Sequence, residues 1–176
     1  NNLVYFLKAI QQTCEEEGIT MTIHPDDPPY PILGLPRIAS DEEDLLYIMS
    51  KVPESFNGIC FCTGSLGAGL HNELPKIRAK VGASVYFAHL RNVKKNSRGD
   101  FYEAEHLDGD VDMAAIMQQL INLNKSRERP IFYRPDHGHQ ILDDLKKETN
   151  PGYSAIGRLK GLAELRGLEI GLDRQK

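Results

Sequence analysis

Apolar and polar positions along the chain alternate between the period of helices and the pattern of short buried strands. Residues 3–17 carry an apolar stripe at helical spacing, and Gly18 is placed to end that helix. Residues 19–24, ITMTIH, are β-branched and apolar, which predicts a strand. A proline-rich loop then excludes regular structure until Ser40, where the next helix is predicted to begin.

The same unit of strand and helix recurs three more times. Ser40 and Glu43 have the spacing of a capping box for the helix that runs to about residue 51. Further strands are predicted at residues 57–62, 84–89 and 130–134. Further helices are predicted at about 70–81 (interrupted at Pro75), 111–122, 140–147 and 153–166. Short continuous apolar strands joined by helices favour a parallel sheet covered by helices, either open or closed into a barrel.

Two connections stand out from the rest of the pattern. Residues 63–69, TGSLGAG, have the composition of a glycine-rich turn but lack the Gly-Lys-Ser/Thr ending of a nucleotide-binding loop. A turn of this kind can present its backbone N–H groups to an anion at a helix start. Residues 91–110 form a polar loop that is too long for a simple connection, so we expect it to carry function.

Composition narrows the class of protein. The 176 residues are 40% hydrophobic and 26% charged, as in globular domains, and no apolar run approaches the ~18–20 residues of a membrane span. The net charge of −4 gives no reason to expect nucleic acid as a partner. Three cysteines do not make a disulfide framework, and the first residues lack signal-peptide features. We therefore expect a cytoplasmic protein.

Each predicted strand ends in residues that bind metals or move protons. They are His24, Cys62, His89 and the group Arg134, Asp136 and His137. Because parallel strands end at one edge of the sheet, these side chains are expected to meet there. Strand parity does not choose between Cys60 and Cys62, although Cys62 is nearer the strand end.

Two histidines, a thiol and a carboxylate suit Zn²⁺, Fe²⁺ or Mn²⁺. One histidine at a strand end is more commonly a structural hydrogen-bonding residue, but four such positions in register favour a metal site. His139 has two possible roles, either supporting a metal ligand or capping the following helix.

Six stretches of the sequence resemble the mannonate dehydratase family, in order and over nearly the whole chain. They are IHPDDPPYPILGLPRI (23–38), FCTGSLGA (61–68), FAHLRN (87–92), EAEHLDGDVDM (103–113), RPDHGHQILDDL (134–145) and NPGYSAIGRLKGLAELRG (150–167). The resemblance implies a (β/α)₈ TIM barrel of the xylose-isomerase-like kind. It also implies a hydro-lyase that dehydrates D-mannonate to 2-dehydro-3-deoxy-D-gluconate in hexuronate (glucuronate) breakdown.

The resemblance further implies a cofactor and site residues. The cofactor is Fe²⁺ or Mn²⁺, and the family's ligand positions fall on His24, Cys62, His89 and Asp136. The family's acid–base positions fall on His137 and Tyr153, with either one as the acid, and Arg134 lies beside them. Arg134 would bind the substrate carboxylate or lower the pKa of Tyr153. The further candidates for substrate contact are Arg91, His106 and Ser65. We also expect a homodimer or a higher homo-oligomer.

The length of the chain departs from the family. A (β/α)₈ barrel takes ~250 residues or more, whereas residues 1–176 supply about four strand–helix units. We therefore expect these residues to be the C-terminal half of one barrel domain, cut from a longer polypeptide or completed by a partner half. Two other functions stay open from the residues: a metal-dependent sugar isomerase on a related barrel, and a non-catalytic domain with a closed structural metal site.

Overall fold

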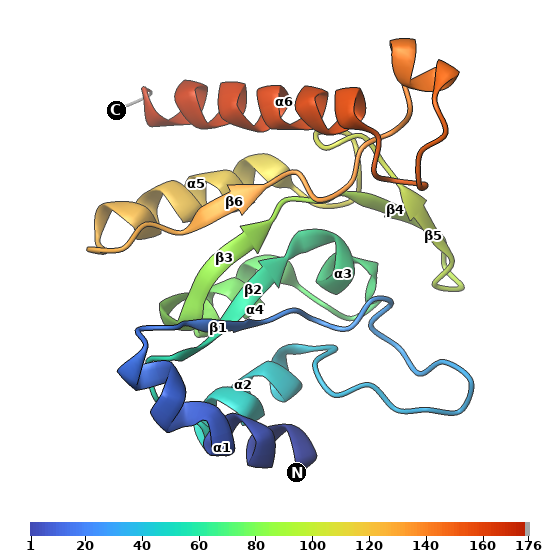
Figure 1. Ribbon diagram of the computed structural model, residues 1–176. Helices are drawn as coiled ribbons and strands as arrows, with labels where there is room; N and C mark the ends of the chain where they lie inside the picture. The colour runs from blue at the N-terminus through green and yellow to red at the C-terminus, as the bar shows by residue number, and fades with distance from the viewer. Residues whose placement is uncertain (175–176) are drawn as a thin grey trace.

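A computed structural model describes residues 1–174, which form a four-stranded parallel sheet with helices packed around it (Figure 1). The strands lie in the order β1-β2-β3-β6, and all three pairings are parallel. Their bounds are β1 Met21–Ile23, β2 Asn57–Cys62, β3 Val85–His89 and β6 Phe132–Arg134. The α/β prediction is confirmed, and within residues 1–174 no further strand pairs with the outer edge of β1 or β6.

Within residues 1–174, five longer helices connect and cover the strands: α1 Asn2–Glu16, α2 Glu42–Lys51, α4 Leu74–Val81, α5 Met113–Lys125 and α6 Ala155–Asp173. Three short ones are α3 Thr63–Ala68 and the 3₁₀ turns η1 Gly82–Ser84 and η2 Leu142–Lys146. The core lies between the sheet and these helices, where Leu45, Phe61, Ile77 and Met117 are fully buried. Burying such apolar side chains is the main driving force for this layered packing.

Two helix starts differ from the sequence prediction. The side chain that caps α2 is Asp41, which accepts a hydrogen bond from the Asp44 N–H, so the prediction of Ser40 as the cap was wrong by one residue. Pro75 does not interrupt α4 but lies in its first turn. Proline suits that position because the N–H it lacks would have no partner inside the helix.

The glycine-rich segment is a helical turn rather than an irregular one. Residues Thr63–Ala68 form α3, and all six are buried. The cap is Cys62, whose sulfur accepts the Ser65 N–H. Glycine lowers helix propensity, which is why composition alone predicted a turn here, but capping and burial outweigh that preference.

The long polar loop contains a two-stranded antiparallel hairpin, β4 Val93–Lys95 and β5 Phe101–Glu103. Its turn is closed by backbone hydrogen bonds between Asn96, Gly99 and Asp100, with Gly99 at a φ of 88°. Strands of three residues are too short to show alternation, so the sequence pattern did not reveal them. Residues 140–147, predicted as a helix, supply only the 3₁₀ turn η2.

The carboxyl ends of the strands lie side by side at one edge of the sheet. Cys62 pairs in register with His89, and His89 pairs with Arg134. The loops that follow these strands, together with the β4–β5 hairpin, lie at the same end of the sheet (Figure 1). Among residues 1–174, no helix combines the length and the apolar character that crossing a membrane requires.

Candidate metal centre and acid–base site

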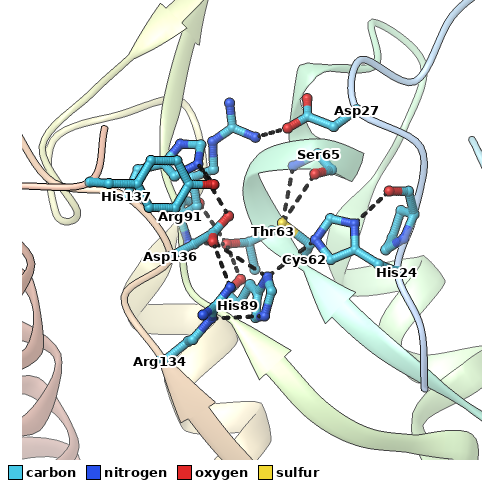
Figure 2. Close-up of polar contacts among 12 residues, drawn as sticks. His24, Asp27, Cys62, Thr63, Ser65, His89, Arg91, Arg134, Asp136 and His137 are labelled. Carbon is cyan, nitrogen blue, oxygen red and sulfur yellow. Dashed lines mark hydrogen bonds and ion pairs between the residues drawn. The ribbon is translucent and has the colours of Figure 1, made fainter. Parts of the chain in front are cut away.

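The four predicted metal ligands meet at the carboxyl end of the sheet. One ligand atom from each of His24, Cys62, His89 and Asp136 lies within 4.8 Å of all the others. Figure 2 shows these side chains converging from separate strands and loops. Adjacent ligands of one cation with bonds of ~2.1 Å lie about 3.0–3.4 Å apart, so this donor set fits a divalent metal ion.

The two histidine rings are oriented by their other contacts. His24 donates its Nδ1 hydrogen to the carbonyl of Pro25 at 2.6 Å, which leaves the Nε2 lone pair facing the centre. That Nε2 lies 3.1 Å from Nδ1 of His89. A carbonyl acceptor behind a histidine is the usual way in which a metal-binding ring is held in place.

Cys62 is distinguished from Cys60 by its surroundings. The Ser65 hydroxyl donates to the Cys62 sulfur at 3.2 Å, and the Ser65 N–H donates to it at 3.4 Å. Both donors belong to one residue of α3, so they hold the sulfur of Cys62 in place. In contrast, burial, with the nearby Cys62 and Asp136, raises the pKa of the Cys60 thiol to about 12. The structure thus places the sulfur of Cys62, rather than that of Cys60, among the candidate ligands, and metal binding by Cys62 stays a prediction.

Arg134 contacts two members of the cluster. Its Nε donates to Nε2 of His89 at 3.0 Å, and its terminal nitrogen donates to Asp136 at 3.1 Å. The Arg134 side chain is half exposed, so the guanidinium lies at the rim of the centre. The cation that lies over the Tyr153 ring is Arg158, at 5.7 Å from the ring centroid. The catalytic role of Arg134 stays a prediction.

The predicted acid–base pair is in direct contact. Nε2 of His137 lies 3.3 Å from the hydroxyl of Tyr153. On the other side of the ring, Nδ1 of His137 lies 3.0 Å from a carboxylate oxygen of Glu103, at the end of β5. Tyr153 is 48% exposed, so this pair lies at the surface of the described residues.

Close packing at the start of α6 brings Tyr153 to His137. Ser154 precedes α6 and donates its hydroxyl hydrogen to the carbonyls of Gly138 and His139. Gly157 lies so close to this loop that an added Cβ would come within 2.0 Å of the His139 carbonyl oxygen. The sequences RPDHGH (134–139) and PGYSAIG (151–157) therefore form one packed unit.

The three predicted substrate contacts are all buried. Ser65 lies behind Cys62. Arg91 is 4% exposed, and its guanidinium is paired with Glu103 and Asp27. His106 packs against α6, with Nδ1 at 3.9 Å from Glu164. Substrate contact by these residues stays a prediction.

Sequence reasoning did not single out two carboxylates that the structure places beside the site, Asp27 and Glu103. Both lie inside stretches that carry the family resemblance, IHPDDPP and EAEHLDGDVDM, and this is the signal that was available. Their partner Arg91 joins the loop after β1 to the β4–β5 hairpin.

A second group of possible ligands, Glu105, His106 and Glu164, lies near α6. Its carboxylates already have a cationic partner, because the Lys160 ammonium forms ion pairs with both Glu105 and Glu164. Burial lowers the pKa of His106, and the two glutamates oppose that effect. We assign this group to packing between the loop after β5 and α6.

Comparison with known proteins decides the family. The sequence model of the D-mannonate dehydratase (UxuA) family matches residues 1–176. The chain belongs to the mannonate dehydratase family. A curated mannonate dehydratase from Brucella canis is 47% identical over 175 residues, which are 98% of this chain and 44% of the relative.

Solved structures agree with the family and the fold. The crystal structure of mannonate dehydratase from Streptococcus suis serotype 2 matches with a TM-score of 0.89 at 36% identity, over 98% of this chain and 49% of that one. A xylose isomerase domain protein from Planctomyces limnophilus matches with a TM-score of 0.66 at 17% identity, over 99% of this chain and 54% of that one. The fold is that of xylose-isomerase-like TIM barrels, and the chain spans about half the length of the relatives it matches.

Proposed function

We propose that the full-length protein carrying this chain dehydrates D-mannonate to 2-dehydro-3-deoxy-D-gluconate. The observation that supports this most directly is the position of the His137–Tyr153 pair beside four convergent donors, in a chain of the mannonate dehydratase family. We further propose that His24, Cys62, His89 and Asp136 hold Fe²⁺ or Mn²⁺. The cytoplasmic location and the role in hexuronate breakdown are part of this proposal.

The reaction removes a proton from C2 and a hydroxyl group from C3. The C2 proton is only weakly acidic, because it lies next to a carboxylate that is already negative. A divalent metal bound at the cluster supplies Lewis-acid stabilisation of the charge that builds on this carboxylate. Arg134, half exposed at the rim, is the proposed cationic contact for the substrate carboxylate.

His137 and Tyr153 supply the two proton transfers. One takes the C2 proton, and the other gives a proton to the departing C3 hydroxyl, which leaves as water. The enol that forms then tautomerises to the 2-keto-3-deoxy acid. After one turnover the base holds an extra proton and the acid lacks one. A proton moving along the 3.3 Å contact between Nε2 and the hydroxyl restores both groups.

We also propose that residues 1–176 are the C-terminal half of a single TIM-barrel domain. Phe132 on β6 is 67% exposed, and in register it pairs with Phe87 of β3, which pairs in turn with Cys60 of β2. An exposed aromatic ring on a sheet face with unpaired edge strands is what half of a barrel presents. The remaining strands would cover this face. A homo-oligomer of the complete protein stays a prediction.

The test uses full-length protein loaded with Fe²⁺ or Mn²⁺ and incubated with D-mannonate. We expect a 2-keto-3-deoxy acid, detected by its keto group and by NMR, and no product after chelation. The variant His137→Ala should lose the activity, whereas Cys60→Ala should keep it. A ketose in place of the keto acid would indicate an isomerase, and no product with either metal would overturn the proposal.

A further inference from the structure

Glu103 contacts His137 on the side of the imidazole ring that faces away from Tyr153. It comes from the β4–β5 hairpin, whereas His137 follows β6, so the contact joins two separate loops. One oxygen of Glu103 lies 3.0 Å from Nδ1 of His137, whose Nε2 lies 3.3 Å from the Tyr153 hydroxyl. The imidazole is therefore held between a carboxylate and a phenol.

Arg91 fixes the position of the Glu103 carboxylate. Its Nε lies 2.9 Å and 3.0 Å from the two oxygens of Glu103, and a terminal nitrogen makes a further contact with one of them. The other terminal nitrogen pairs with Asp27. A guanidinium is charged at any ordinary pH, and these two carboxylates compensate its burial.

The ionisation of Glu103 follows from these partners. Burial alone would raise the pKa of this carboxyl, but the hydrogen bonds from His137 and Arg91, with the charges of both, lower it to about 2. A carboxylate only accepts hydrogen bonds. The hydrogen of a neutral His137 ring therefore lies on Nδ1, and the Nε2 lone pair faces Tyr153.

We propose that Glu103 is a positioning residue that fixes the ring orientation and the tautomer of His137, with Arg91 holding Glu103 in place. The catalytic part of this inference rests on the proposed function. Among residues 1–174, the hydrogen bonds and ion pairs of the Glu103 side chain are with Arg91 and His137, and none is with the four donors of the cluster or with Tyr153. It acts on the reaction through His137.

Glu103→Gln in full-length, Mn²⁺-loaded protein is the kinetic test. The single amide oxygen is expected to face Arg91, which turns the amide NH₂ toward Nδ1 of His137 and favours the wrong tautomer. We expect kcat to fall by about 10–100-fold, while KM and the bound metal stay within about twofold. Glu105→Gln is the matched control, because Glu105 pairs with Lys160, and its kcat should be unchanged. An unchanged kcat for Glu103→Gln would overturn the inference. So would a loss of bound metal as large as the loss of kcat in this variant.

NMR of protein labelled with ¹⁵N-histidine tests the tautomer without turnover. With diamagnetic Mg²⁺ present, His137 should carry its hydrogen on Nδ1 in the wild type and on Nε2 in Glu103→Gln. An Nε2 hydrogen in the wild type, or no change in the variant, would contradict the role of Glu103. If the wild type shows the Nδ1 form but does not dehydrate D-mannonate, the proposed function fails while the positioning of His137 by Glu103 stands.

Discussion

The hydroxyl oxygen of Ser65 lies 3.2 Å from the sulfur of Cys62, and the N–H of Ser65 points to the same sulfur. One residue of α3 thus supplies two hydrogen bonds to a proposed metal ligand. Hydrogen bonds from neighbouring residues orient a metal ligand and tune its binding.

Ser65→Ala should therefore weaken metal binding by about tenfold, because the hydroxyl donor is lost while the N–H remains. Titration of the metal-free, full-length protein with Mn²⁺ gives the affinity. The same variant tests the substrate contact predicted for Ser65. A higher KM for D-mannonate at unchanged metal affinity would favour substrate contact over support of Cys62.

Cys62→Ser should lower the affinity for metal by on the order of 100-fold, since one of four donors changes from thiolate to hydroxyl. Cys60→Ala is the matched control, because Cys60 lies two residues earlier in β2 and its pKa of about 12 keeps it a neutral thiol. Metal content measured after gel filtration distinguishes the variants, because Cys62→Ser should lose metal and Cys60→Ala should retain it. Equal losses in both variants would contradict the assignment of Cys62 as the ligand.

Gly157→Ala should lower the free energy of unfolding by about 1–3 kcal/mol and also reduce kcat. The new Cβ would lie 2.0 Å from the His139 carbonyl oxygen and 2.6 Å from the Ser154 hydroxyl, so the start of α6 and Tyr153 must move.

Gly171→Ala, later in α6, is the control for Gly157→Ala. Nothing lies within 4 Å of its new Cβ, so higher helix propensity should stabilise the protein by up to about 1 kcal/mol. Urea unfolding of Gly157→Ala and Gly171→Ala gives the free energy of unfolding of each variant and so checks both expectations. A stabilised Gly157→Ala protein would show that the loop contact is not tight.

The ionisation of Glu103 predicts a dependence of stability on pH. Its pKa is about 2 in the folded protein and 4.5 in the unfolded chain. The stabilisation is thus present above pH 4.5 and is lost as pH falls toward 2, and its size is on the order of 1–3 kcal/mol. Urea unfolding of metal-free wild type and Glu103→Gln should show a difference that narrows over this range. A constant difference would indicate that the charge of Glu103 is not the cause.

The sequence pattern predicted the four strands of the sheet and the strand ends that carry the candidate functional residues. Both predictions depend on local properties, because buried strands are short and apolar, and parallel strands end at a common edge. The β4–β5 hairpin was missed because its strands have three residues each. The helix over Thr63–Ala68 was missed because its stability comes from burial and from the Cys62 cap rather than from propensity.

The sequence by itself determined the fold class and the family, and it predicted the donors His24, Cys62, His89 and Asp136. These follow from residue types at strand ends and from sequence motifs, both of which can be recognised from the order of residues along the chain. The tertiary structure placed Cys62 rather than Cys60 beside the other candidate ligands, paired Arg91 with Glu103 and Asp27, and placed Glu103 against His137. Those relationships join segments that are far apart in the chain, so they depend on how the loops and α6 pack rather than on any local pattern.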